Sequence, residues 1–288
     1  MKNSKKFKLV LQGALAAVIG LASASSMAAT SWSLDTCSTS YNASTGLGQQ
    51  TANSGNYGNS FKCGAASGTN NVTVTAFGAS TVSGSTTYDA AFLKQNGATW
   101  GFGVASKNEG IGVGAPDHSM DNNPNNGVPD LILLKFDTAV ALASLTLGWS
   151  QSDADITLMA YTGSGDPNAL IKGKTASTLR TNSGTGWTMV ANYGDADAAN
   201  ATGYASSGTD ILVVNGASTV SSWWLISAYN SGFGGGTLDS LTDYVKLLSV
   251  ASKDVTVTNR TPEPASLALV GLALVGAAGA RRRAKKSA

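Results

Sequence analysis

Four residues whose side chains could hold a hard metal ion lie within ten positions of one another in the sequence of this 288-residue chain. They are Asp121, Asn122, Asn126 and Asp130, and all four offer the oxygen atoms that Ca²⁺ prefers. Their spacing is not that of an EF-hand, which needs Asp-x-Asp-x-Asp-Gly and a later Glu. The alternative is a turn in which these side chains bond their own backbone. The sequence therefore predicts either a Ca²⁺ site or an Asx-rich turn, and no other cofactor.

A hydrolytic site is the second chemistry to consider, because Asp117, His118 and Ser119 are consecutive. Neighbouring side chains on an extended chain point to opposite faces, so three in a row cannot form a nucleophile–base–orienter relay. The chain has a single His, and no Gly-x-Ser-x-Gly elbow joins a strand to a helix. The sequence thus predicts no enzyme, and a hydrolase would have to use His118 or a pair of carboxylates.

Two consecutive aromatic residues, Trp223 and Trp224, could bind sugars. They lie in a stretch with the pattern of a strand, so one of them must face outward or into a second sheet. An exposed Trp would give a sugar ring a flat face on which to stack. The alternative is burial on both faces of the strand.

The elements that would position these residues are β-strands. Alternating apolar and polar residues are typical of half-buried strands, and they recur at 72–77, 145–149, 156–161, 187–193, 211–214, 223–229 and 244–251. Residues 131–136 are apolar on both faces except for Lys135, as expected in the middle of a sandwich. Residues 153–155 have the composition of a hairpin turn, and no helix is predicted between the two ends of the chain. The predicted fold class is all-β, a β-sandwich or jelly roll.

Charge argues against one class of partner. Residues 30–261 hold ten basic and sixteen acidic side chains, a net charge of −6, although the whole chain carries +2. A nucleic-acid-binding protein presents a basic face. We therefore expect no nucleic-acid partner.

The N-terminus has the pattern of an export signal. Four lysines within 1–8 precede the apolar run 9–22, and small residues follow at 23–29. This order predicts a secretory signal helix that the Sec translocon recognises and signal peptidase cleaves after Ala28 or Ala29. The alternative is an uncleaved membrane anchor, for which the run is short.

The predicted export would place both cysteines, Cys37 and Cys63, in an oxidising compartment. An even pair in an oxidising compartment predicts a disulfide, and closing this loop would contribute roughly 3 kcal/mol. The alternative is a catalytic thiol, which the distant position of the only His disfavours.

The C-terminus contains a Pro-Glu-Pro tripeptide, an apolar run and a basic cluster, in that order. The tripeptide is Pro262, Glu263 and Pro264, the run is 265–280, and the cluster begins with Arg281, Arg282 and Arg283. As a helix the run would rise only about 24 Å, and a stable span needs about 20 residues. The basic cluster should stay cytoplasmic. Such a helix suits a processing signal better than a permanent anchor.

This tail resembles the PEP-CTERM sorting signal of Gram-negative bacteria over residues 261–286. The resemblance implies recognition by an exosortase, cleavage near the motif, and a host that makes extracellular polysaccharide. It implies an inner-membrane intermediate held by the C-terminal helix, followed by display at the cell surface or release. The expected organisation is a signal peptide at 1–29, a β-sandwich ectodomain at 30–258 and a sorting signal at 259–288.

Residues 100–255 also resemble the ectodomain shared by a group of exosortase-dependent surface proteins. The matching residues are Gly112, His118, Asp121, Asn122, Asp130, Phe136, Leu147, Gly148, Trp149, Asp153 and Asp155, with 243–248 as a closing strand. This resemblance implies location and fold rather than a mechanism.

Three functions remain open from the sequence. The first is an exported, non-enzymatic surface or matrix protein with a role in biofilm or exopolysaccharide. The second is a Ca²⁺-dependent carbohydrate-binding module that acts on the cell's own exopolysaccharide. The third is a secreted hydrolase.

Overall fold

The computed structural model describes residues 24–27, 29–35, 37–40, 50–52, 55–112, 116, 118–123, 127–181, 185–194, 210–236, 238–253, 255–258 and 273. The chain divides into two compact units, one spanning 27–255 and the other made of 1–26 with 256–288. Strands β1 (Ala24–Met27) and β17 (Val255–Thr258) form a two-stranded sheet of their own. No helix in the described part of the chain is long and apolar enough to cross a membrane.

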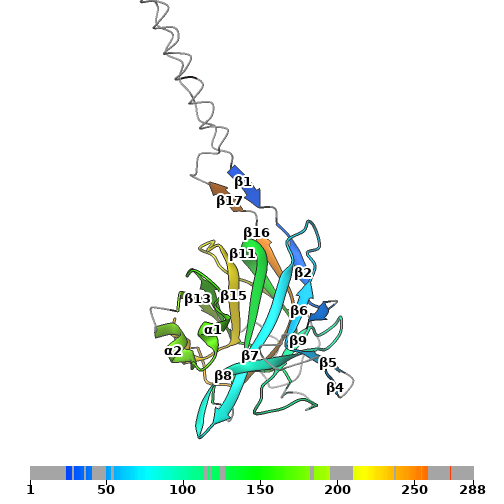
Figure 1. Cartoon of the computed structure of the whole chain (residues 1–288), viewed down its shortest axis with the longest axis vertical. Helices are drawn as coiled ribbons and strands as arrows, with labels where there is room; N and C mark the ends of the chain where they lie inside the picture. The colour runs from blue at the N-terminus through cyan, green and yellow to red at the C-terminus, as the bar shows by residue number, and fades with distance from the viewer. Residues whose placement is uncertain are drawn as a thin grey trace, which may run out of the picture. The chain divides into compact units, whose positions relative to one another are not determined.

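The larger unit is built from strands, which confirms the predicted all-β class (Figure 1). They are β2 (Ser31–Ser33), β3 (Ser38–Ser40), β4 (Gln50–Ala52), β5 (Gly55–Gly58), β6 (Ser60–Cys63), β7 (Val72–Val82), β8 (Ser85–Gln95), β9 (Phe102–Ala105), β10 (Met120–Asp121), β11 (Leu131–Ser152), β12 (Ile156–Tyr161), β13 (Trp187–Tyr193), β14 (Asp210–Val213), β15 (Ser221–Ala228) and β16 (Asp243–Lys253).

Strands β7, β8, β9, β16 and β11 pair in a closed ring. Two long strands make the closure possible. The first half of β11 pairs with β7 and β15, and its second half pairs with β16 and β14, with a register shift between Lys135 and Val140. In the same way β8 pairs first with β7 and then, from Phe92 onward, with β9. The two sheets of the unit therefore share β8 and β11.

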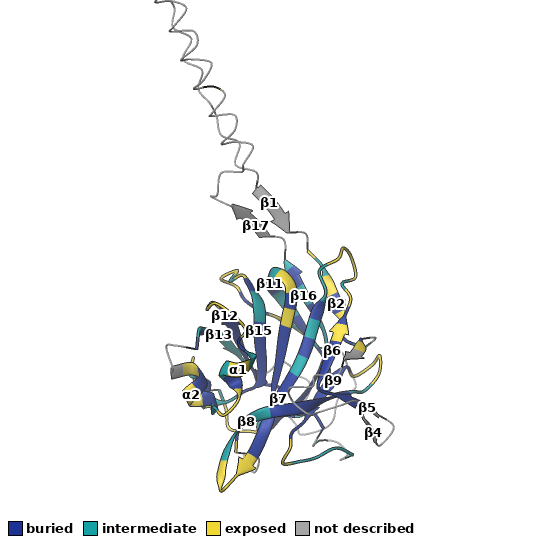
Figure 2. Ribbon diagram, in the orientation of Figure 1, coloured by how far each residue is buried: buried dark blue, intermediate teal, exposed yellow. Residues whose placement is uncertain are grey.

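The main core lies between these sheets, and the strands that enclose it are mostly buried (Figure 2). Its largest side chains come from strands far apart in the sequence: Trp32, Phe61, Phe102, Phe136 and Trp224. Trp32 packs edge-on against Phe136 with ring centroids 4.7 Å apart, and Phe61 meets Phe102 at the same distance. These contacts join β2 to β11 and β6 to β9.

Short helices cover the outer face of the sheet that contains β7, β11, β12 and β15. They are α1 (Asn168–Ile171), α2 (Ala176–Thr181) and the 3₁₀ turn η1 (Ser231–Phe233). Ile171, Leu179 and Phe233 from these helices form a second buried cluster with Leu131 and Leu133 of β11. The prediction that the body has no helix is therefore wrong, and this cover explains why 131–136 is apolar on both faces.

Two further predictions concern connections. The predicted disulfide is confirmed, since Cys37 and Cys63 are bonded across 26 positions of sequence. The hairpin predicted at 153–155 is wrong, because β12 pairs with β13 and β15 and not with β11. The segment instead carries the chain from the sheet that contains the end of β11 to the other sheet.

Candidate metal centre

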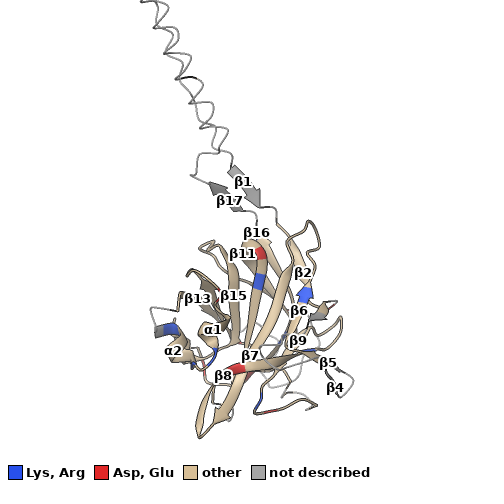
Figure 3. Cartoon of the chain, in the orientation of Figure 1, with Lys and Arg blue, Asp and Glu red and all other residues tan. Residues whose placement is uncertain are grey.

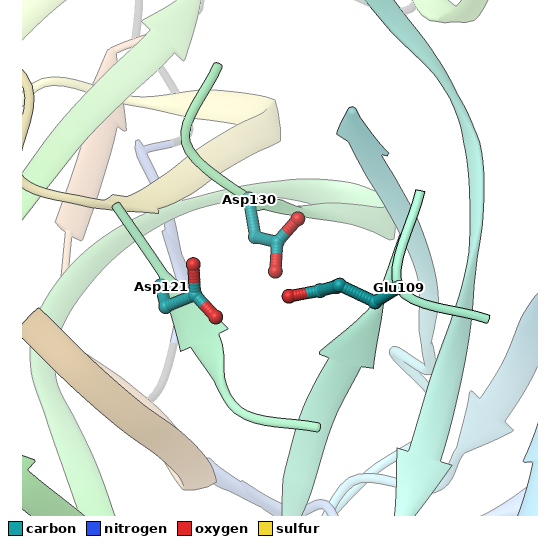
Figure 4. Close-up of side chains that lie close together, drawn as sticks. All are labelled: Glu109, Asp121 and Asp130. Atoms are coloured by element: carbon teal, nitrogen blue, oxygen red, sulfur yellow. The ribbon is translucent and has the colours of Figure 1, made fainter. Parts of the chain in front are cut away.

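The first acidic cluster consists of Glu109, Asp121 and Asp130. Glu109 follows β9, Asp121 ends β10, and Asp130 immediately precedes β11. One carboxylate oxygen from each residue lies within 4.8 Å of the other two, and the three side chains point toward one another (Figure 4). Two full charges at such a distance repel by about 3 kcal/mol at an effective dielectric constant of ~20. Three ionised carboxylates here need a counter-charge, or some of them must keep a proton.

Backbone groups orient two members of this cluster. Glu109 Oε2 accepts a hydrogen bond from the backbone N–H of Ser106 at 2.8 Å. Asp121 Oδ1 accepts from the backbone N–H of Asn123 at 2.9 Å. The backbone N–H of Asp130 donates to the carbonyl oxygen of Asp121 at 2.7 Å. These hydrogen bonds therefore hold the β9–β10 and β10–β11 connections close to the acidic cluster.

Asp130 is the most unusual member. It is only 1% exposed, and neither of its carboxylate oxygens accepts a hydrogen bond from any residue that the structure describes. A Cβ at Gly78 of β7 would lie 2.5 Å from Asp130 Oδ1, so this glycine leaves the space that the carboxylate occupies. Burial raises the pKa of Asp130 well above its usual range, and the charges of Asp121 and Glu109 raise it further.

The second acidic cluster consists of Asp153, Asp155 and Asp243, which also offer oxygens within 4.8 Å of one another. Backbone and side-chain donors contact the carboxylates of Asp153 and Asp243. Asp243 Oδ1 accepts from the backbone N–H of Asp155 at 2.7 Å, and Asp153 Oδ1 accepts from that of Ala154 at 2.8 Å. Burial raises the pKa of Asp243 to about 9 and that of Asp153 to about 6, and neighbouring carboxylates contribute to both shifts.

Asn122 belongs to the second cluster rather than to the first. Its Nδ2 donates to Asp243 Oδ2 and, at 2.8 Å, to the carbonyl oxygen of Tyr229. Its Oδ1 accepts from the backbone N–H of Asp243 at 2.8 Å. The prediction that Asn122 would be a ligand together with Asp121 and Asp130 is therefore wrong. The reason is geometric, because neighbouring side chains on an extended chain point to opposite sides.

Two of the four predicted Ca²⁺ ligands, Asp121 and Asp130, thus come together. Asn126 lies outside the described residues. Glu109, the third member, was not predicted from the sequence. The available signal was composition, since Glu109 is one of only two glutamates in the chain and the other is Glu263.

The only His of the chain lies beside a buried lysine. His118 Nε2 is 3.0 Å from Lys246 Nζ. The Lys246 ammonium also lies over the rings of Trp149 and Trp100, at 4.3 and 5.3 Å from their centroids. Burial lowers the pKa of Lys246 to about 8. A general base gains a proton during catalysis, and the neighbouring ammonium disfavours a positive charge on His118.

Trp224 cannot be the predicted sugar-stacking residue. Its side chain is fully buried, and its Nε1 donates to the carbonyl oxygen of Ser221 at 2.9 Å. Trp223 is half-buried, and Lys135 Nζ lies 5.0 Å from its ring centroid. The lysine therefore already occupies one face of the ring that a sugar would use.

One cavity near the surface, of about 340 Å³, is lined by two carboxylates, those of Asp89 and Asp166. Asp89 forms ion pairs with Lys107 at 2.6 Å and with Lys172 at 3.1 Å. Burial raises the pKa of Asp89, but its hydrogen bonds outweigh this effect and leave the pKa below its usual value. Such a carboxylate is a poor proton donor.

The decisive comparison concerns the C-terminal tail. Its sorting residues lie outside the described part of the chain: Pro262, Glu263, Pro264, Arg281, Arg282 and Arg283. Residues 260–283 match the PEP-CTERM protein-sorting motif. The chain carries a PEP-CTERM sorting signal. This signal makes it an exosortase-targeted extracellular protein, which passes through a membrane-associated sorting step before surface display. The chain matches no curated protein and no solved structure.

Proposed function

We propose that this PEP-CTERM protein is a non-enzymatic component of the cell surface or extracellular matrix, where it works together with the exopolysaccharide of its host. The observation that carries the proposal is the sorting motif at 260–283. In the proposed route, the Sec translocon exports the chain and signal peptidase removes its N-terminus. The exosortase then cleaves near Pro262–Pro264 while the C-terminal helix holds the chain in the inner membrane.

The chemistry of the larger unit supports a structural role. Charged side chains are sparse along its strands (Figure 3), and they make up 12% of the whole chain. The carboxylates of both acidic clusters are largely buried, and His118 is engaged with Lys246. A hydrolase would instead place its acid and base side by side on an accessible cleft.

The mature C-terminus tests this proposal. Intact-mass spectrometry of the exported protein should find an end close to residues 262–264 in cells that contain the exosortase. The same strain without its exosortase should keep the full tail through residue 288. An unprocessed tail in both strains would contradict the proposal.

A second candidate function is Ca²⁺-dependent binding of the host polysaccharide, and the first acidic cluster is the observation that favours it. Co-sedimentation with purified exopolysaccharide, in Ca²⁺ and in chelator, separates the two candidates. Binding that needs Ca²⁺ supports the carbohydrate-binding module. Binding that is equal in Ca²⁺ and in chelator supports a matrix protein that binds the polysaccharide without Ca²⁺.

A further inference from the structure

We propose that Glu109, Asp121 and Asp130 bind one Ca²⁺ ion, which fastens the connection between β9 and β11 to the closed ring of strands. The proposal concerns stability and does not depend on the exosortase step. Its first support is the geometry of the cluster, in which carboxylates from the β9–β10 connection, the end of β10 and the β10–β11 connection converge (Figure 4). Oxygens that bind one Ca²⁺ at 2.3–2.6 Å lie no more than about 5 Å apart, and these lie within 4.8 Å.

The second support is Asp130, which is independent of the clustering itself. Its carboxylate is 1% exposed, faces the other two, and accepts no hydrogen bond from any described residue. A buried polar group in a native fold almost always has a partner, and an unpaired charge is the most costly kind to bury. A bound cation would supply the missing partner for both oxygens.

The surroundings leave room for this carboxylate rather than for a side chain that would neutralise it. Gly78 lies beside Asp130, where any Cβ would come within 2.5 Å of Oδ1 and 2.7 Å of Ser106 Cβ. Tyr88 is fully buried close by, and its hydroxyl also has no hydrogen-bond partner among the described residues. Tyr88 can donate a hydrogen bond but carries no positive charge.

Shared protons would be the other way to relieve the repulsion. A proton held between two carboxylates draws their oxygens to about 2.5–2.7 Å as a short hydrogen bond. The first cluster offers three carboxylates around a common centre, which suits an ion.

The donor set selects the type of ion. All three ligands are carboxylates, and hard cations take oxygen ligands whereas Zn²⁺ and Cu²⁺ favour nitrogen or sulfur. Mg²⁺ usually keeps several of its waters and uses one or two carboxylates, while Ca²⁺ accepts carboxylates in either denticity. Extracellular modules bind Ca²⁺ with Kd values of about 10⁻⁴–10⁻³ M, a range that suits an exported protein.

The experiment measures thermal unfolding and binding calorimetry on the protein purified after export, stripped with a chelator and titrated with CaCl₂. We expect one ion per chain and a Tm that rises with Ca²⁺, because a ligand of the folded state stabilises it by mass action. Glu109→Gln and Asp130→Asn should each weaken Ca²⁺ binding at least tenfold. Glu109 is only half-buried, so its variant should fold even if Asp130→Asn does not. A parallel MgCl₂ titration should need a higher concentration for the same Tm.

Asp153→Asn is the matched control, because it removes one carboxylate from the second cluster and leaves the first intact. It should keep the Ca²⁺ response of the wild type. The proposal is overturned if Ca²⁺ changes neither Tm nor heat, or if Glu109→Gln responds like the wild type. It is equally overturned if Asp153→Asn alone abolishes the response, or if MgCl₂ and CaCl₂ act alike.

Discussion

At the scale of single residues, Asn122 is the side chain on which the second acidic cluster depends. Asn122→Ala would leave the backbone N–H of Asp243 and the carbonyl oxygen of Tyr229 without their amide partner. Leaving buried polar groups unpaired costs about 1–3 kcal/mol, and urea unfolding should register a loss of this size. Asn108→Ala is the control, since Asn108 also bonds in both directions, to Thr81, but on an exposed turn. Water can replace those bonds, so an equal loss in both variants would contradict the prediction.

The second acidic cluster also predicts how stability depends on pH. The folded pKa values of Asp153 and Asp243, about 6 and about 9, lie above the ordinary aspartate value of 3.8. The folded state therefore binds more protons than the unfolded state, and stability present below pH ~4 is lost as pH rises through 6 and then 9. Asp153→Asn should remove the share of this loss that Asp153 contributes, which is complete by about pH 6, and leave the share of Asp243, which continues toward pH 9.

Urea unfolding from pH 4 to 8, in chelator so that no cation intervenes, measures this slope. Asp137→Asn is the control, because Asp137 is exposed and hydrogen bonds from Asn71 lower its pKa. Its removal should not flatten the slope between pH 4 and 6. If wild type and Asp153→Asn lose stability in parallel over that interval, the raised pKa of Asp153 is wrong.

At the scale of elements, the disulfide ties β6 to the segment that precedes β3. Cys37 and Cys63 are both buried and enclose a separation of 26 positions. The Cys37→Ala, Cys63→Ala double variant should lose about 3 kcal/mol, because its unfolded chain regains the entropy of the open loop. Unfolding in urea with and without a reductant measures the effect. Reductant should lower the wild type to the level of the variant and leave the variant unchanged, and a variant as stable as the wild type would contradict the prediction.

Strands with regular alternation were predictable, and those whose course depends on distant partners were not. Residues 156–161 and 187–193 match β12 and β13 because each strand is short and periodic. The sequence predicts two separate strands at 131–136 and 145–149, yet β11 runs unbroken from Leu131 to Ser152 because it passes between two sheets. The helices α1 and α2 have four and six residues, too few to establish a helical period.

The same limit applies to the candidate metal site. Asp121 and Asp130 stood out because they are acidic and flank one loop, which is a local property. Glu109 joins them only because β9 and β10 each lie beside β16, an element more than a hundred positions further along the chain. Local patterns do not carry such pairing information, so the third ligand became visible only in the folded chain.

At the scale of the whole molecule, the sorting tail should decide where the protein goes, independently of the stability of its folded unit. Pro fixes φ near −65° and removes a backbone donor, and two prolines flank Glu263 in the sorting motif. The Pro262→Ala, Pro264→Ala double variant should lose both of these constraints on the motif. It should remain in the membrane fraction with its tail intact, whereas the wild type is released or displayed.

Cell fractionation with immunoblotting, followed by intact-mass measurement, distinguishes the two states. Ser266→Ala is the matched control, because it lies just beyond the motif and keeps the tripeptide, the apolar run and the basic cluster. It should be processed like the wild type. The thermal unfolding of the larger unit should be the same in all three proteins, since residues 27–255 form a compact unit apart from the tail. Normal processing of the double variant would show that Pro262 and Pro264 are not what the exosortase recognises.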